Sequence, residues 1–182
     1  MIAFDWGGTL MEDPGTWSGP MAHWPRVAAV PHAAEVLAAL AAARYRLVVA
    51  TNADESDAAL VLAALARVGL HEHISAVFSS ADLGVQKPGR RFYDAMVARL
   101  AVRPEETIMV GDSYANDVAG AAAAGLRAVW LNRQRQPRPR PQAAADAEVR
   151  SLAELPAAID RLAAGGRRTA ATGERPSGGG AG

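Results

Sequence analysis

Cysteine is absent from the sequence, and lysine occurs only once among the 19 basic residues. The lack of cysteine excludes a disulfide framework, a thiolate zinc site and a cysteine nucleophile. Apolar stretches of the roughly 20 uncharged residues needed to cross a bilayer are also missing. The N-terminus has neither a basic region nor an apolar run of signal-peptide length. Together these absences predict a soluble protein of the reducing cytoplasm.

Charge of either sign is not in excess, because 19 acidic residues balance the 19 basic ones. This balance gives no indication of a nucleic-acid or membrane partner. The single lysine, Lys87, is unusual in a chain that otherwise uses arginine. A compact ammonium on a flexible stem fits sites that the planar guanidinium of arginine does not. Lys87 is therefore a candidate functional residue.

Short apolar runs alternate with longer alanine-rich segments along most of the chain. This alternation is typical of strands joined by helices in a parallel sheet that is covered on both faces. The predicted strands are 1–4, 47–50, 76–78, 107–110 and 128–131, and the predicted helices are 33–43, 58–68, 91–100, 118–124 and 152–164.

A chain of 182 residues, half of them hydrophobic, is long enough for one well-buried core and too short for two full domains. We assign residues 1–164 to this domain. Within it, residues 132–141, including the Arg- and Pro-rich stretch 133–141, are predicted to form a stiff, solvated connection. Residues 165–182 are rich in glycine, arginine, threonine and serine and are predicted to be a disordered tail.

Polar side chains come directly after several of the predicted strands. Asp5 follows the first strand, Thr51 and Asn52 follow the second, and Asp112 follows the fourth. Any one of them alone could be an ordinary cap or loop residue. Ligands, however, bind at the carboxyl ends of the strands in such sheets. Two carboxylates at that edge can hold Mg²⁺ together with water and a substrate phosphate, so the pattern predicts phosphate chemistry.

Four segments resemble, in order, the four motifs of the haloacid dehalogenase superfamily. They are FDWGGTL at 4–10, VVATN at 48–52, QKPGRRFY at 86–93 and VGDSYANDVAGAAAAG at 110–125. The resemblance covers about residues 1–164, and the last motif and QKP are its most specific parts. It implies a Rossmann-like, three-layered α/β/α sandwich around a parallel five-stranded sheet of order 5-4-1-2-3. That order places strands one, two and four side by side, so the motifs converge.

The resemblance also implies roles in phosphoryl transfer. Asp5 would be the nucleophile that accepts the phosphoryl group as an aspartyl-phosphate. Thr51 would bind the phosphoryl oxygens, assisted by Asn52 or nearby backbone N–H groups. Lys87 would neutralise charge between the nucleophile and the phosphate.

A Mg²⁺ site is implied beside the nucleophile. Asp5 and Asp112 would supply carboxylate ligands, and Gly7 would supply its backbone carbonyl. Asp117 would orient the shell around the metal, or Lys87. The substrate would be a phosphorylated small molecule or macromolecule; the oligomeric state is left open.

Position 7 departs from the pattern of most phosphatases in this superfamily. They carry an aspartate there, which protonates the leaving alcohol and then activates water, whereas this chain has Gly7. General acid–base catalysis typically contributes about 10²–10⁴-fold, so activity toward alkyl phosphates should be weak. Acyl or aryl phosphates need no such acid. Substitutes for the missing acid could be Glu12, Asp13, His23 or His32, although each is also a plausible surface or capping residue.

Other branches of the superfamily also lack the second aspartate. Dehalogenation is disfavoured because Asp112 and Asp117 are retained, and phosphonate cleavage through a second lysine is excluded because the chain has only Lys87. The chain is too short for an ion pump. The segment 10–30 is too short for a helical lid and is interpreted as a reduced cap.

Two functions follow from these interpretations. The first is a Mg²⁺-dependent phosphatase or phosphotransferase with weak or specialised activity. The second is a catalytically impaired relative that binds a phosphorylated ligand or a protein partner through the same pocket. The glycine at position 7 is the feature that separates them.

Overall fold

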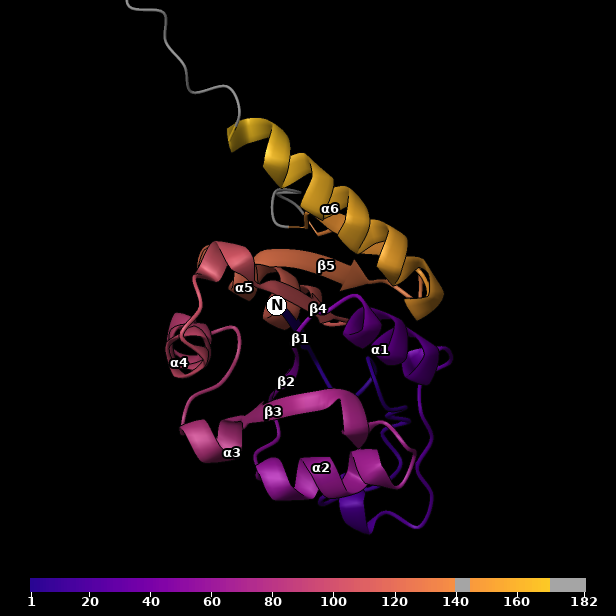
Figure 1. Ribbon diagram of the computed structural model, residues 1–182. Coiled ribbons are helices and arrows are strands. Elements are labelled where there is room, and N and C mark those ends of the chain that lie inside the picture. Colours follow the sequence, from indigo (N-terminus) through magenta and orange to yellow (C-terminus); the bar gives the residue numbers. More distant parts are fainter. Residues whose placement is uncertain (140–144, 171–182) are drawn as a thin grey trace, which may run out of the picture.

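The computed structural model describes residues 1–139 and 145–170. Its architecture is a parallel sheet between two layers of helices, the α/β/α sandwich that the sequence predicts (Figure 1). The strands are β1 (Ile2–Phe4), β2 (Leu47–Thr51), β3 (Ile74–Ser79), β4 (Ile108–Gly111), β5 (Arg127–Leu131) and β6 (Ala147–Val149). The helices are α1 (Ala33–Ala42), α2 (Ala58–Ala66), α3 (Ser80–Leu83), α4 (Arg90–Leu100), α5 (Gly120–Ala123) and α6 (Leu155–Ala170).

The sheet has the order β3-β2-β1-β4-β5-β6, and each of its strand pairs is parallel. The order of the first five strands agrees with the predicted one, but the predicted count of five is wrong. The sixth strand, β6, extends the sheet beside β5. It has only three residues and contains Glu148, so no apolar run marks it in the sequence. Its backbone pairs with that of β5, with Val129 opposite Ala147 and Leu131 opposite Val149.

Alternating residues of the strands build two separate cores. In β1, Ile2 and Phe4 belong to one core and Ala3 belongs to the other, because successive side chains of a strand point to opposite faces. The first core is packed by α1, α2 and α6, and the second by α4 and α5. Figure 1 shows α1 on one side of the sheet and α4 and α5 on the other. Burial on both faces explains why the strands appear as continuous apolar runs.

The segment 10–30 contains one short 3-10 turn, Met21–His23, and no α-helix or longer strand. It is attached to the body at two places. Met11 makes isolated bridges to Gly7 and to Ala29, and the turn packs against α2. The segment therefore covers the carboxyl edge of the sheet as a short flap.

The helix after β4 differs from the predicted helix over 118–124. The chain first makes a π-helical turn, Tyr114–Ala119, and then the single α-helical turn of α5. Such wide turns occur frequently at functional sites. The short helix α3 was also not predicted, because Ser80–Leu83 has only four residues.

The last part of the chain departs from the predicted boundaries in two ways. Helix α6 continues to Ala170, six residues into the segment expected as a tail, although the Gly165–Gly166 pair disfavours helix. Residues 171–182 lie outside the described part of the chain. In the segment expected to be solvated, Asn132 is buried beside β5, and Arg138 pairs with Glu148 at 2.7 Å. Residues 140 and 141 of that segment are also outside the described part.

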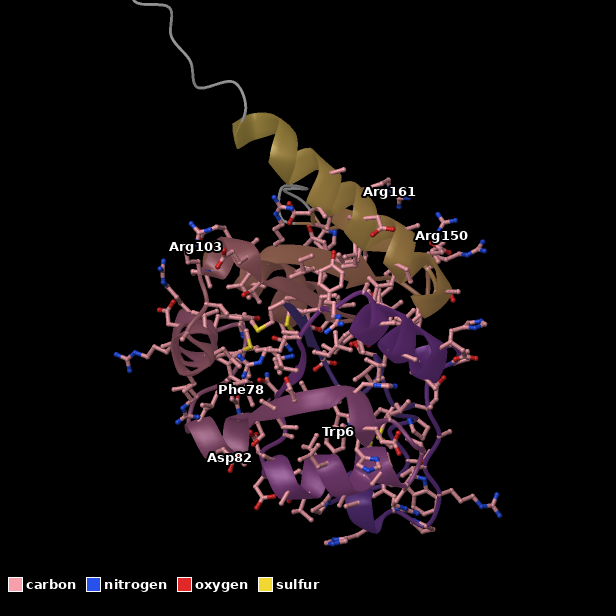
Figure 2. The ribbon with its side chains drawn as sticks, viewed as in Figure 1. Trp6, Phe78, Asp82, Arg103, Arg150 and Arg161 are labelled. Carbon is pink, nitrogen blue, oxygen red and sulfur yellow. The ribbon has the colours of Figure 1, made fainter. Side chains whose placement is uncertain are left out.

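Among the described residues, no helix is both long and apolar enough to cross a membrane. Arginine side chains are spread over the outside of the molecule. Arg103, Arg150 and Arg161, which lie far apart in the sequence, all project outward in Figure 2.

Candidate active site

Lys87 is the centre of a buried network of charges at the carboxyl edge of the sheet. Only 3% of the residue is exposed. Its ammonium donates to Oδ1 of Asp5 at 2.8 Å, to Oδ1 of Asp117 at 2.6 Å and to the backbone carbonyl of Ala50 at 2.8 Å. All three donor positions of the ammonium are therefore used, which anchors it beside the end of β1.

Asn52 holds the loop that carries Lys87. Its Nδ2 donates to the carbonyl of Lys87 and its Oδ1 accepts from the N–H of Lys87, both at 2.8 Å. The two bonds pair the side-chain amide with the backbone as one strand pairs with another. Since both ends of the amide are occupied, Asn52 acts here on the position of Lys87, and a side-chain contact to phosphate would require this pair to open.

Thr9 joins the first and fourth motifs. Its hydroxyl donates to Oδ2 of Asp5 at 3.3 Å and accepts from the backbone N–H of Asp112 at 3.2 Å. The residue is completely buried. On the other side of Asp112, the indole Nε1 of Trp130 donates to the Asp112 carbonyl at 2.9 Å. The backbone of Asp112 is thus fixed from β1 and from β5.

The π-helical turn after β4 contains Asp117 and places its side chain in the cluster. Its Oδ2 accepts from the backbone N–H of Ser113 at 3.0 Å, and its Oδ1 faces Lys87. Glycine at position 111 makes this approach possible, because a Cβ there would lie 2.2 Å from Cγ of Asp117. Both oxygens of Asp117 are therefore engaged within the protein, as expected for a residue that orients Lys87.

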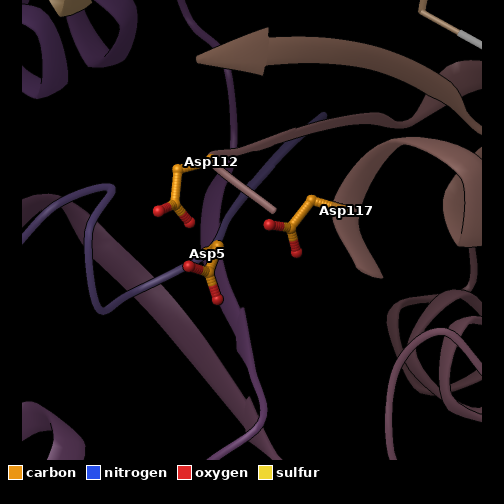
Figure 3. A group of neighbouring side chains, drawn as sticks. All are labelled: Asp5, Asp112 and Asp117. Carbon is orange, nitrogen blue, oxygen red and sulfur yellow. The ribbon is translucent and has the colours of Figure 1, made fainter. Parts of the chain in front are cut away.

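Asp5, Asp112 and Asp117 form a carboxylate cluster whose side chains converge (Figure 3). One oxygen from each lies within 4.8 Å of the others. With Lys87 the cluster has an excess of two negative charges when all groups are ionised. Hard divalent cations prefer such oxygen ligands. The donor set fits a divalent cation, and Asp5 and Asp112 are best placed to hold it because Asp117 already has its own partners.

The charges of the cluster act on one another. Burial lowers the pKa of the Lys87 ammonium, but Asp5 and Asp117 more than compensate, so its pKa is raised overall. Burial and the nearby charge of Asp5 raise the pKa of Asp117, against the opposing effect of Lys87. The pKa of Asp112 is raised by its partly dehydrated position and by Asp5. Each carboxyl would be more easily ionised with a cation bound beside it.

The cluster opens into a pocket of about 460 Å³. One wall comes from the flap, including Asp13, Met21 and Trp24, and the opposite wall comes from the loop after β2. Its acidic lining residues are Asp5, Asp13, Asp54, Glu55, Asp112 and Asp117, whereas Lys87 is the lining residue with a positive charge. An anionic substrate would enter such a pocket only if a cation offset this charge.

A family model described as haloacid dehalogenase-like hydrolase matches residues 21–125. The match includes Thr51, Lys87, Asp112 and Asp117 and begins after Asp5 and Gly7. The chain belongs to this family of hydrolases.

Individual relatives of this haloacid dehalogenase-like hydrolase carry out more than one reaction. A ribulose-1,5-bisphosphate 5-phosphatase of Halopiger xanaduensis is 33% identical over 123 residues, which are 68% of this chain and 49% of that protein. An (S)-2-haloacid dehalogenase 4A of Burkholderia cepacia is 33% identical over 135 residues, which are 74% of this chain and 57% of that protein. The matched regions cover between 28% and 58% of the curated relatives' own lengths.

A solved structure of similar size shares the fold of the hydrolase. It is an uncharacterized protein from Listeria monocytogenes serotype 4b, with a TM-score of 0.79 and 24% identity. The similarity covers 90% of this chain and 98% of the Listeria chain. At this identity it shows the fold alone.

The fold brings together all the residues to which the family resemblance assigned a role in catalysis, phosphate binding or metal binding. Asp5, Gly7, Thr51, Asn52, Lys87, Asp112 and Asp117 all line the same pocket. Their chemical roles, and the Gly7 carbonyl as a metal ligand, stay predictions.

Sequence reasoning missed two contributors. Thr9 was part of the first motif but had no assigned role, and its buried hydroxyl is the link between Asp5 and Asp112. Asp54 lies in the polar stretch after β2 and accepts from the Ser80 hydroxyl at 2.6 Å and from Gln86 at 2.8 Å. The hydrogen bond from Ser80, and then that from Gln86, lowers the pKa of Asp54. The run of polar residues after Thr51 was the available signal.

Proposed function

We propose that this hydrolase cleaves phosphate esters or anhydrides with Mg²⁺, using Asp5 as a nucleophile. The observation that carries the proposal is the contact of Lys87 with Asp5 beside a cluster of further carboxylates. This arrangement supplies a nucleophile, a fixed cation and oxygen ligands for a metal within one pocket. Phosphatases among the relatives support the same class of reaction.

The reaction would proceed in two steps. An oxygen of Asp5 attacks the phosphorus, a bond from Asp5 to phosphorus forms, and the bond from phosphorus to the leaving oxygen breaks. Water then attacks the phosphorus of the aspartyl-phosphate, which releases inorganic phosphate and restores the Asp5 carboxylate. A bound Mg²⁺ would supply charge neutralisation for the phosphoryl oxygens.

Side chains of the pocket would position the nucleophile and stabilise the charge on the phosphoryl oxygens. Lys87 holds Asp5 in place and offers positive charge where the phosphoryl oxygens develop negative charge. Thr51, which is 3% exposed and lines the pocket, would donate its hydroxyl to a phosphoryl oxygen. Asn52 would act mainly by keeping Lys87 in position. Asp112 would share the metal with Asp5, and Gly7 would add its carbonyl.

Dehalogenation of a 2-haloacid is the competing reaction in the family. A haloacid presents a carboxylate that must be held while Asp5 attacks carbon. The lining of this pocket carries six acidic residues and Lys87, whose ammonium is fully engaged. Such a surface disfavours a free carboxylate and favours a ligand that arrives with a divalent cation.

The glycine at position 7 makes substrates with good leaving groups the first to test. The leaving groups of acetyl phosphate and p-nitrophenyl phosphate, acetate and p-nitrophenolate, depart without a proton. Formation of the aspartyl-phosphate from these substrates therefore needs only Asp5, Lys87 and the metal. We expect the full chain to hydrolyse both with Mg²⁺. Asp5→Asn should reduce turnover to background, and removal of metal by a chelator should do the same until Mg²⁺ is restored.

Two outcomes would contradict this proposal. One is turnover that persists in Asp5→Asn, which would point to a contaminant or another nucleophile. The other is the absence of Asp5-dependent turnover with either compound, while phosphate or a phosphate mimic still binds. That result would favour a protein that binds a phosphorylated ligand without cleaving it.

A further inference from the structure

The missing acid at position 7 has a neighbour in the folded chain. A Cβ built on Gly7 would lie 3.3 Å from Oδ2 and 3.6 Å from Cβ of Asp13. Cε of Met21 would lie between these two in distance, at 3.5 Å. A side chain at position 7 would therefore contact the carboxylate of Asp13. The flap thus places a carboxylate next to position 7, where most phosphatases of the family have their own aspartate.

The other residues that could have replaced the acid are less well placed. Glu12 makes two hydrogen bonds with the guanidinium of Arg133, at 2.5 and 3.0 Å. His23 and His32 are not among the residues that line the pocket, whereas Asp13 is. Of the four candidates named from the sequence, Asp13 alone shares the pocket with Asp5 and Lys87.

The position of Asp13 is defined by the backbone of the flap. Met11 bridges both Gly7 and Ala29, and the N–H of Glu12 donates to the Ala28 carbonyl at 2.9 Å. Oδ1 of Asp13 accepts from the N–H of Gly15 at 3.0 Å, which fixes the carboxyl group within a local turn. This leaves Oδ2 on the side of Gly7. In the described part of the chain, Asp13 takes part in no salt bridge.

We propose that Asp13 is the general acid and base of this hydrolase, in place of an aspartate at position 7. This inference rests on the proposed function, since it assigns the proton transfers of the same reaction. As the bond from phosphorus to the leaving oxygen breaks, Asp13 gives its proton to that oxygen and becomes a carboxylate. As water attacks the aspartyl-phosphate, Asp13 takes a proton from the water and is ready for another cycle.

The exposure of Asp13 agrees with both steps. Asp13 is exposed and lines the pocket, so a leaving alcohol and an incoming water can both reach its carboxyl group. A substrate would then need no acid of its own. The hydrolase should accept ordinary alkyl phosphates as well as activated ones, which differs from the expectation drawn from Gly7 alone.

The test compares a substrate that needs an acid with one that does not. Glycerol 3-phosphate releases an alkoxide, whereas acetyl phosphate releases a stable carboxylate. Asp13→Asn retains an oxygen that can accept from Gly15, so the local turn should persist. We expect this variant to lose about 10²–10⁴-fold in kcat/KM with glycerol 3-phosphate. With acetyl phosphate the loss in the first step should be small, within about threefold by the same argument.

Two further variants make the comparison specific. Glu55→Gln removes another carboxylate from the pocket lining, and any effect of it should be equal for the two substrates. Combining Gly7→Asp with Asp13→Asn moves the carboxylate back to position 7. This double variant should regain a large part of the activity toward glycerol 3-phosphate. The single Gly7→Asp change should instead lower the activity of the unaltered chain toward glycerol 3-phosphate, because it places two carboxylates in contact.

The outcomes separate the two proposals. Loss of turnover of both substrates in Asp5→Asn, with an equal loss of kcat/KM for both substrates in Asp13→Asn, would overturn the role of Asp13 and keep the proposed function. A loss in Asp13→Asn that is confined to the alkyl substrate would support it. No Asp5-dependent turnover of either substrate in the unaltered chain would overturn the proposed function, and with it the proton transfers assigned to Asp13.

Discussion

The single lysine, Lys87, connects three separate parts of the pocket. An ammonium buried without partners would be strongly destabilising, and here it is matched by two carboxylates and one carbonyl. An arginine would need room for a planar group with five N–H donors in a space that holds one nitrogen. This explains why a chain with 18 arginines has kept one lysine. The unusual composition was therefore a useful indication of function.

Gly8 combines a left-handed backbone conformation with close contact to the proposed metal site. Its φ is +78°, and a Cβ there would lie 2.4 Å from Oδ2 of Asp112. We expect Gly8→Ala to strain the backbone and to displace the Asp112 carboxylate. The strain should cost about 1 kcal/mol of unfolding free energy. The displacement should raise, by roughly tenfold or more, the Mg²⁺ concentration needed for half-maximal activity, since a metal ligand has moved.

Gly84 provides the matched control. Its φ is +66°, close to that of Gly8, but a Cβ there would meet no atom within 4 Å. Gly84→Ala should therefore lose similar stability in urea unfolding without changing the Mg²⁺ requirement. An equal shift of the Mg²⁺ requirement in both variants would mean that backbone strain, and not contact with Asp112, is responsible.

At the scale of elements, one side chain supplies hydrogen bonds that join the flap to the end of α2. Nη1 of Arg67, just after α2, donates to the carbonyls of Met21, Ala22 and Trp24 at 3.3, 3.0 and 2.7 Å. Arg67 therefore fixes the wall of the pocket that carries Met21 and Trp24.

Arg67→Met should loosen the flap while the sheet stays folded. Loss of these hydrogen bonds should allow the segment to open more often, by roughly five- to tenfold, since each is worth about 1 kcal/mol or less at the surface. Limited trypsin digestion followed by mass spectrometry should show faster cleavage after the exposed Arg26. Arg99→Met, on the exposed face of α4, removes an arginine without touching the flap and should leave that rate unchanged. Equal cleavage in both variants would contradict the role of Arg67.

At the scale of the whole molecule, the segments that follow β1, β2 and β4 gather acidic residues at one edge of the sheet. The pocket there is acidic although the chain as a whole has no net charge. This concentration of acidic groups affects Asp112, because partial burial and the nearby charge of Asp5 raise its pKa above the ordinary value of 3.8. The folded protein thus holds this proton more tightly than the unfolded chain. The contribution of Asp112 to stability falls as pH rises through this raised pKa.

Asp112→Asn should therefore stabilise the metal-free protein at pH 7, and the difference from the unaltered chain should shrink toward acidic pH. With Mg²⁺ present, the unaltered chain should be more stable than the variant. The unaltered chain gains about 2.7 kcal/mol at a metal concentration of 100 Kd, whereas the variant gains much less. Thermal unfolding with a chelator and with Mg²⁺, at several pH values, measures both effects. The same Mg²⁺-dependent gain in both proteins would show that the metal binds elsewhere.

The sequence by itself determined the class of fold and, through the resemblance of its motifs to the family, the order of the first five strands and several members of the pocket. The class of fold depends on local patterns, because apolar runs mark the strands, and the carboxyl ends of parallel strands meet at one edge. Asp5, Thr51, Lys87 and Asp112 could be nominated because each directly follows a strand or lies in a recognisable motif.

The tertiary structure alone decided how these residues are held and which neighbours they have. The pairing of Asn52 with Lys87 spans 35 positions, and the hydrogen bond of Thr9 to Asp112 spans 103. Strand β6 exists because β5 offers it an edge, and Asp13 reaches Gly7 because Met11 bridges Gly7 and Ala29. Contacts of this kind depend on the packing of distant segments, which no local pattern of residues encodes.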